Sequence, residues 1–248
     1  MKAAIFLLLS APVLLWAQVE PFFAQGNAHY QNGNYEDAIA AYQTVVQAGF
    51  ESAELYYNMG NAYFKQNEIG EAVLFYEKAL KLAPRDADIA YNLGLAQLYV
   101  VDRVETPPPF FIQKYWQGVL YLFSRTQLAL WTLVIYLISV GLWTMRLLLR
   151  RRKGWLIISR AAAAAGIVFI VFLFLLLARE RRERTEVFAV VMQERVEVLS
   201  GPAVDSTPVF ALHEGVKVQL GPSSGEYVQI SLVDGKVGWL PKETVEKI

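Results

Sequence analysis

The chain contains no cysteine and only two histidines. Without cysteine it has no disulfide, no thiol nucleophile, no cysteine-ligated zinc site and no lipid-modified N-terminal cysteine. The two histidines, His29 and His213, lie in segments of different periodicity, and the sequence has no nucleotide-binding loop. We therefore expect a protein that is not an enzyme, with no catalytic residue, no cofactor and no metal.

Net charge is absent too, because 23 Lys and Arg residues balance 23 Asp and Glu residues. A protein that binds nucleic acid usually carries a basic excess, so the balance argues against that partner. Apolar residues, in contrast, are abundant: a hydrophobic content of 55% and a mean hydropathy of +0.30 exceed those of an ordinary soluble domain. The composition favours an integral membrane protein.

Charged residues are missing from two long windows, residues 126–145 and 161–178. Each window is about long enough for a helix to cross a hydrocarbon core about 30 Å thick. We predict transmembrane helices at 126–146 and 160–179, joined by a short loop at 147–159. Because the windows hold no charged side chain, we do not expect a pump, a proton relay or an ion path within this chain.

The orientation follows from the first segment of the chain and from the basic residues. Residues 1–17 combine a basic start, a short apolar run and a small final residue, which is typical of a cleaved signal peptide; an uncleaved anchor would give the same topology. The positive-inside rule places the basic loop in the cytoplasm, although four arginines after the second span favour the opposite orientation. Since the loop has more basic residues, we predict a bacterial inner-membrane protein with both soluble domains in the periplasm. The residues in or beside the loop are Arg146, Arg150, Arg151, Arg152, Lys153 and Arg160.

Residues 18–101 repeat with a period of 34. Gly26, Gly60 and Gly94 follow this spacing, as do Tyr42 and Tyr76. The pattern resembles the tetratricopeptide repeat, which implies an all-α superhelix of paired antiparallel helices. We expect two full repeats and a single capping helix from Ala87 to about Val101, with Pro84 ending the preceding helix and Asp86 capping the next.

The resemblance also implies a concave face that could hold a peptide. Side-chain amides at successive inward positions can pair with the backbone of an extended peptide, so we propose a peptide groove. In the alternative interpretation, Asn58 and Asn92 bond the backbones of neighbouring helices and a partner contacts another face. The groove residues expected from the family pattern are Asn27, Tyr30, Gln31, Asn58, Asn61, Phe64, Lys65 and Asn92.

Two segments connect the repeats, the spans and the tail. Residues 102–125 contain three consecutive prolines (107–109) and then aromatic residues, which predicts a stiff neck and a helix in the membrane interface; a helix buried against a partner's membrane domain is the alternative. Residues 180–185 form a charged linker that should continue the second span as a helix, with Arg179/Glu183 and Glu180/Arg184 pairs. The small residues Ala162 and Gly166 permit close packing, either within the hairpin or against a partner helix.

Residues 186–248 change to short β-branched runs separated by turn signals such as Asp234-Gly235. The runs are 187–192, 196–199, 209–212, 216–220, 227–232 and 237–240. The order, with L-H-E-G and G-W-L-P, resembles a bacterial SH3 domain and implies a C-terminal all-β SH3-like barrel. Tyr227 and Trp239 are the candidate ligand-surface residues, although packing of the barrel is the favoured interpretation for Trp239. Gly238 is expected to hold a backbone conformation that only glycine adopts.

The order of these parts resembles the BatE-type family of Bat aerotolerance proteins. That resemblance implies a non-enzymatic scaffold that works with the other Bat-cluster proteins, which are membrane proteins with von Willebrand A-type domains. A cell-wall protein that binds peptidoglycan through its SH3 domain is the alternative function.

Overall fold

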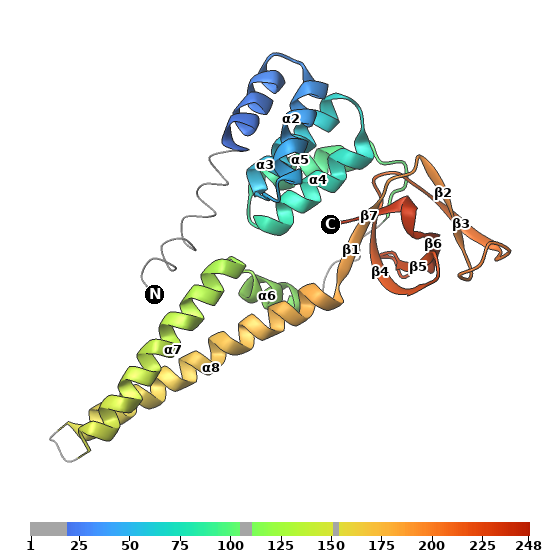
Figure 1. Cartoon of the computed structure of the whole chain (residues 1–248). Helices are drawn as coiled ribbons and strands as arrows, with labels where there is room; N and C mark the ends of the chain where they lie inside the picture. Colours follow the sequence, from blue (N-terminus) through green and yellow to red (C-terminus); the bar gives the residue numbers. More distant parts are fainter. Residues whose placement is uncertain (1–18, 105–110, 151–153) are drawn as a thin grey trace. The chain divides into compact units, whose positions relative to one another are not determined.

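The computed structural model describes residues 19–104, 111–150 and 154–248, which divide into two compact units. The repeat–sheet unit comprises the described residues 19–104 and 187–248, and the hairpin unit comprises those within 111–186 (Figure 1). The predicted signal peptide, the proline triplet and loop residues 151–153 lie outside the described residues.

The helical part of the repeat–sheet unit is a stack of antiparallel helices. A helix over residues 19–31 is followed by α2 (Tyr35–Gln47), α3 (Ala53–Lys65), α4 (Ile69–Leu82) and α5 (Ala87–Gln97). The glycine of each full repeat lies where its two helices meet. A Cβ atom on Gly60 would lie 2.6 Å from the Tyr76 ring, and one on Gly26 would overlap the Tyr42 ring. The glycines that recur with the period of 34 therefore allow close contacts between paired helices.

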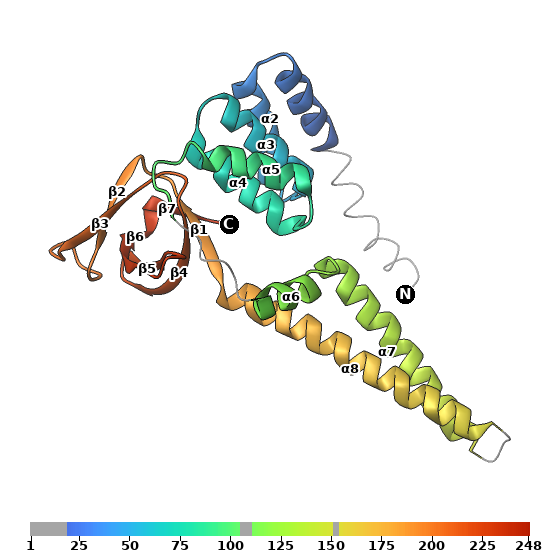
Figure 2. The ribbon, with the colours of Figure 1, turned by 180° about the vertical axis from the view of Figure 1, so that it is seen from behind.

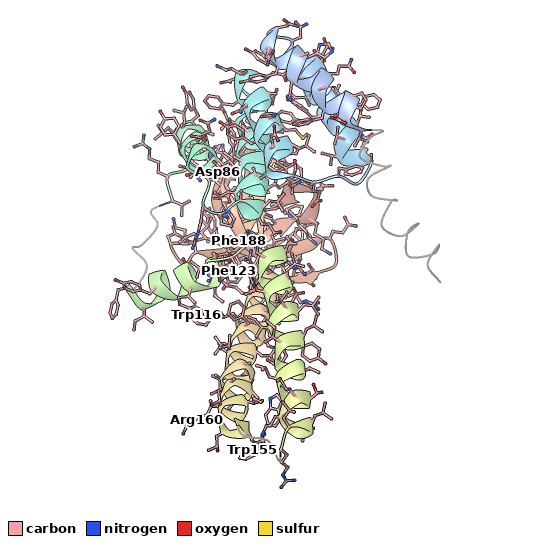
Figure 3. The ribbon with its side chains drawn as sticks, turned by 90° about the vertical axis from the view of Figure 1, so that its left-hand side faces the viewer. Asp86, Trp116, Phe123, Trp155, Arg160 and Phe188 are labelled. Carbon is pink, nitrogen blue, oxygen red and sulfur yellow. The ribbon has the colours of Figure 1, made fainter. Side chains whose placement is uncertain are left out.

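The boundary between α4 and α5 follows the sequence prediction. Helix α4 ends at Leu82, shortly before Pro84. The Asp86 carboxylate accepts hydrogen bonds from the backbone N–H groups of Asp88 (3.0 Å) and Ile89 (3.1 Å), so it caps α5 (Figure 3).

The C-terminal part is an antiparallel sheet with the strand order β3-β2-β6-β5-β4-β1-β7, which can be followed from both sides in Figures 1 and 2. The strands are β1 (Val187–Val191), β2 (Arg195–Leu199), β3 (Pro208–His213), β4 (Lys217–Ser224), β5 (Tyr227–Ser231), β6 (Val237–Pro241) and β7 (Val245–Lys247). In the described residues the edge strands β3 and β7 do not pair, so the sheet is open and does not show the closure of the predicted barrel.

The strands overlap the six predicted runs, with two differences. Strand β4 continues through Gly221 to Ser224, where we expected a turn, and pairs with β5 after a bulge. Strand β7, reached through a short 3-10 turn (Lys242–Thr244), has no counterpart in the prediction. It pairs with β1 and brings the chain end, Ile248, next to Phe188.

Gly238 is required for space and not for backbone conformation. It is not among the glycines with positive φ, so the predicted reason for it was wrong. A Cβ atom there would collide with the Val198 side chain and lie 3.0 Å from the Leu199 carbonyl oxygen. Glycine thus allows β2 and β6 to approach.

The hairpin unit consists of α6 (Phe111–Leu120), α7 (Arg125–Leu148) and α8 (Trp155–Thr185). Helices α7 and α8 are both long and apolar enough to cross a membrane. They pack side by side: Ala162 is fully buried, and a Cβ on Gly166 would lie 3.8 Å from the Trp143 indole nitrogen. Helix α8 includes residues 180–185, as predicted, and both expected Arg–Glu pairs form at 2.8 Å.

Candidate protein-interaction site

Four of the predicted groove residues form a hydrogen-bonded ladder across the repeats, which we call the amide ladder: Asn27, Asn58, Asn61 and Asn92. Its first rung joins three helices. The Asn27 Oδ1 atom accepts hydrogen bonds from the Tyr42 hydroxyl (2.7 Å) and from the Asn58 amide nitrogen (3.0 Å). Asn27 thus links the helix over residues 19–31 to both α2 and α3.

The second rung repeats the first 34 residues later. Asn61 Oδ1 accepts from the Tyr76 hydroxyl (2.7 Å) and from Asn92 Nδ2 (2.9 Å), and that nitrogen also donates to the Tyr57 hydroxyl (2.9 Å). Desolvation is the largest cause that raises the pKa of Tyr42, to about 12, and it raises the pKa of Tyr76 as well. Both hydroxyls therefore stay protonated and can donate to their asparagine.

The ladder uses only one end of each amide. Within the described residues, Nδ2 of Asn27 and of Asn61 finds no acceptor, and Oδ1 of Asn58 and of Asn92 finds no donor. All four side chains are half-buried. Along the ladder the free groups therefore alternate between donor and acceptor. An extended peptide backbone offers the complementary alternation of C=O and N–H groups.

The other predicted groove residues differ in their surroundings. Tyr30 is half-buried, with its ring centroid 5.4 Å from that of Tyr35. Phe64 is half-buried, with its centroid 5.4 Å from that of Tyr99 in an edge-to-face contact. Gln31 and Lys65 are exposed at the last residues of their helices. The structure therefore joins the asparagines in two similar rungs and leaves Gln31 and Lys65 outside the described hydrogen bonds of both.

A contact between the repeats and the sheet was not predicted from the sequence. Val190 lies in one buried cluster with residues of α4 and α5, and Met192 and Ile248 pack against it. Glu77, buried in α4, pairs with Lys217 of β4 at 2.6 Å, and the Lys217 ammonium lies 5.0 Å from the Phe188 ring centroid. An acidic residue on the apolar face of α4 was the available sequence signal.

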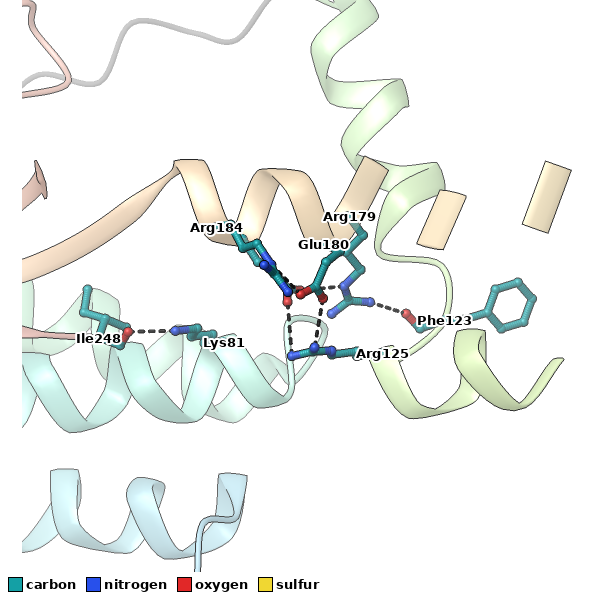
Figure 4. A network of polar contacts seen from close by, with 8 residues as sticks. Lys81, Phe123, Arg125, Arg179, Glu180, Arg184 and Ile248 are labelled. Carbon is teal, nitrogen blue, oxygen red and sulfur yellow. Dashed lines mark hydrogen bonds and ion pairs between the residues drawn. The ribbon is translucent and has the colours of Figure 1, made fainter. Parts of the chain in front are cut away.

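Two further polar contacts join the repeats to the sheet. Lys81 Nζ donates to the Ile248 carbonyl oxygen at 2.7 Å (Figure 4). The Asp102 carboxylate accepts from the His213 backbone N–H at 2.6 Å and lies 3.2 Å from the His213 ring nitrogen Nδ1. His213 is thus explained by a structural contact.

The segment after α5 also belongs to the sheet. Val100 and Val104 pack against the core cluster of the sheet, on either side of Asp102. The third repeat has no second helix in the described residues, because the chain that would begin it contacts the sheet instead.

The two candidate residues on the sheet share one face but not one pocket. Tyr227 and Trp239 alternate with the buried residues of β5 and β6, and both are half-buried. Tyr227 lies opposite Pro241, and Trp239 lies opposite Gln229. A surface pocket of about 510 Å³ is lined by Val204, Gly225, Glu226, Tyr227, Pro241, Lys242 and Glu243. The pocket lining thus contains Tyr227 and not Trp239.

A charged network connects α8 to the α6–α7 junction in the hairpin unit (Figure 4). The Arg179 side chain, which is buried, donates to Glu183 (2.8 Å) and to the Phe123 carbonyl oxygen (2.7 Å). Arg125 pairs with Glu180 at 2.8 Å. The network fixes the ends of α7 and α8 relative to each other.

Among the described residues, no group of three or more His, Asp or Glu side chains could hold a metal ion. The Tetratricopeptide repeat family model matches residues 23–87 and 57–98, which cover the helical part of the repeat–sheet unit. A comparison with curated proteins finds no match to the chain. The N-terminal helices are tetratricopeptide repeats, and such repeats are modules for protein–protein interaction.

Proposed function

We propose that the protein is a membrane-anchored, non-enzymatic scaffold whose tetratricopeptide repeats hold an extended segment of a partner protein. The observation that carries this proposal is the amide ladder. Its half-buried donors and acceptors are fixed by tyrosine hydroxyls and face no partner within the described residues. A row of preorganised amides loses little conformational entropy when it binds a peptide backbone.

The proposed topology is a hairpin with both soluble parts on one side of the membrane. The repeats precede the two candidate spans and the sheet follows them, and yet repeats and sheet pack in one compact unit. Two crossings return the chain to the side from which it started, so this packing supports the hairpin. Together with the basic loop and the signal segment, it supports a bacterial inner-membrane protein with a periplasmic repeat–sheet unit.

The resemblance to BatE-type proteins supports a partner class. The order of signal segment, repeats, proline-rich neck, hairpin and SH3-like tail suggests a place in a Bat aerotolerance complex. The partners would then be membrane proteins with von Willebrand A-type domains. The exposed aromatic residues of α6, among them Phe111, Tyr115 and Trp116, suit a helix that lies at the membrane surface beside such a partner.

An isosteric substitution tests the amide ladder. Asn27→Asp with Asn61→Asp keeps the oxygen that accepts from Tyr42 and Tyr76 but replaces the free N–H donors with acceptors. After chemical crosslinking in native membranes, we expect the double variant to capture at least tenfold less partner protein than the wild type captures. Gln47→Glu, an exposed substitution at the end of α2, is the matched control for added charge and should capture the wild-type amount. Equal capture by the double variant would refute the peptide site.

The pocket beside Tyr227 favours a second candidate function, in which the SH3-like sheet binds peptidoglycan. Its lining combines an aromatic ring with Lys242, Glu226 and Glu243, which suits a peptide with both charges. Sedimentation of the full chain with sacculi tests this candidate. Cosedimentation that Tyr227→Ala removes and the amide-ladder variant retains would favour it, whereas protein left in the supernatant would reject it.

A further inference from the structure

Helix α5 is apolar on both of its faces. Ile89, Leu93 and Ala96 are buried in the repeat–sheet unit. On the opposite face, Tyr91 is 72% exposed and Leu95 is 36% exposed, and the C-cap residue Leu98, which continues this face, is 73% exposed. The exposed polar residues of α5, Asp88 and Gln97, lie near its two ends, so the middle of the helix presents an apolar surface that lacks a covering element within the unit.

The two full repeats show what normally covers this position. The second helix of each repeat places a tyrosine ring directly on the repeat glycine, Tyr42 on Gly26 and Tyr76 on Gly60. A Cβ added to the third repeat glycine, Gly94, would meet nothing within 4 Å. The packing site for an aromatic residue on an antiparallel helix is thus repeated a third time and left open.

The exposed face of α5 contains both halves of such a contact. Large residues form one row along the helix, and small residues form a parallel row beside it. The large row is Tyr91, Leu95 and Leu98, and the small row is Ala87, Ala90 and Gly94, all six exposed. Two copies of α5 in antiparallel orientation can therefore supply large residues to each other's small ones.

One register satisfies all the contacts at once. When Tyr91 of one copy lies level with Gly94 of the second copy, Leu95 lies level with Ala90 and Leu98 with Ala87 of that copy. Each layer then holds one large and one small side chain, as in antiparallel helix pairs that pack closely. The arrangement is self-complementary, as an interface between copies related by a two-fold axis must be.

We propose that the exposed face of α5 is a dimerisation surface for a second copy of this chain. The area that an 11-residue helix can bury is small for a stable interface. Confinement of both copies to one membrane, which rests on the proposed hairpin, would raise their effective concentration and compensate for that small area. The amide ladder is not part of this surface.

Site-directed crosslinking tests the register, and the absence of native cysteine makes the result unambiguous. Tyr91→Cys and Gly94→Cys chains carrying different tags are coexpressed, and the membranes are oxidised. We expect a disulfide-linked dimer that contains both tags, at least tenfold more abundant than with Gln97→Cys chains. Gln97 is exposed on α5, but in this register it lies level with Asp88 of the second copy, so the two Gln97 residues are far apart along the helices. Equal crosslinking at Gln97 would refute the register.

The oligomeric state of the full chain tests the surface itself. In phosphatidylcholine vesicles and in mild detergent, Gly94→Leu and Leu98→Asp should each weaken dimerisation at least tenfold and leave the thermal melt unchanged. A wild-type chain that stays monomeric in vesicles at high density would overturn the proposal, even if the amide ladder binds its partner. A dimer that both variants preserve would also overturn it.

Discussion

The second and third repeats have the same glycine and different neighbours. Gly60 is covered by the Tyr76 ring, whereas the position of Gly94 is open. Within residues 19–104, a second helix follows the first only in the second repeat, because the segment after α5 packs on the sheet through Val100 and Asp102. A repeat position therefore acquires its energetic role from the helix that follows it, and the period alone does not predict that role.

The largest expected difference between the two repeats is the response to a large side chain at the glycine. Gly60→Leu should unfold the repeats, because its side chain must displace Tyr76 between α3 and α4; overpacking of a core costs about 1–3 kcal/mol or more. Gly94→Leu should leave the free energy of unfolding unchanged or slightly higher, because leucine favours helix over glycine. Circular-dichroism melts of both variants measure the contrast. Equal destabilisation would show that α5 is covered in the folded chain.

A second contrast concerns the asparagines of the amide ladder. Asn61→Ala removes the acceptor of two half-buried donors, the Tyr76 hydroxyl and the Asn92 amide, at about 1–3 kcal/mol for each donor left unpaired. Asn92→Ala removes only a donor, so it should destabilise the fold less. The losses in the free energy of unfolding caused by Asn27→Ala and by Asn61→Ala should roughly add in the double variant, since the two rungs are separate.

This expectation differs from the one that the sequence supports. From the family pattern, Asn27 and Asn61 are exposed groove positions whose loss hardly affects stability. In the structure they are half-buried acceptors, so alanine variants test stability together with binding. Urea denaturation of Asn61→Ala and Asn92→Ala separates these interpretations, and equal midpoints would contradict the ladder geometry.

What the sequence predicts well in this chain is local. The 34-residue period, the Asp86 cap, the Arg179/Glu183 pair and the six strand runs depend on neighbours within a turn or a hairpin. What it misses is tertiary. The pairing of Glu77 with Lys217 joins residues 140 positions apart, and no local pattern marks either one as the other's partner.

The same division explains the errors in the candidate sites and in the sheet. Gly238 looks like a conformational glycine from its turn-rich surroundings, but the cause is the distant Val198 side chain. The extension of β4 through Gly221 depends on its pairing with β5. The peptide groove at the asparagines stays a prediction, while their mutual hydrogen bonds became visible only with the helices in place.

The tyrosines of the two full repeats predict sensitivity to alkaline pH. The folded-state pKa of Tyr42 is raised to about 12, mainly by desolvation, above the ordinary tyrosine value of 10.0. The folded state therefore keeps its proton longer than the unfolded state. This contribution to stability is complete below pH 10.0 and is lost as pH rises to about 12. It amounts to about 2–3 kcal/mol, because a difference of one pKa unit between the folded and unfolded states corresponds to about 1.36 kcal/mol.

Denaturation at a series of pH values measures this effect. The free energy of unfolding of the wild type should fall between pH 10 and 12. In Tyr42→Phe the fall should be smaller, although the variant starts from a lower stability because Asn27 loses a donor. A parallel decline in both proteins would show that Tyr42 ionises freely in the folded state.

The smallest effect is expected where the sheet covers the helices. Lys217→Met removes the partner of Glu77, which is 7% exposed, but Lys217 itself is 37% exposed. Solvent screening at the lysine limits the loss to about 1 kcal/mol, well below the cost of breaking a fully buried pair.

Glu77→Gln with Lys217→Met should recover part of the loss, because no unpaired charge then remains under the sheet. The coupling energy from a double-mutant cycle, measured by urea denaturation of the full chain, should be about 1 kcal/mol. A coupling energy near zero would mean that Val190, Met192 and Ile248 hold the sheet to the repeats without help from the ion pair, because apolar burial does not depend on charge.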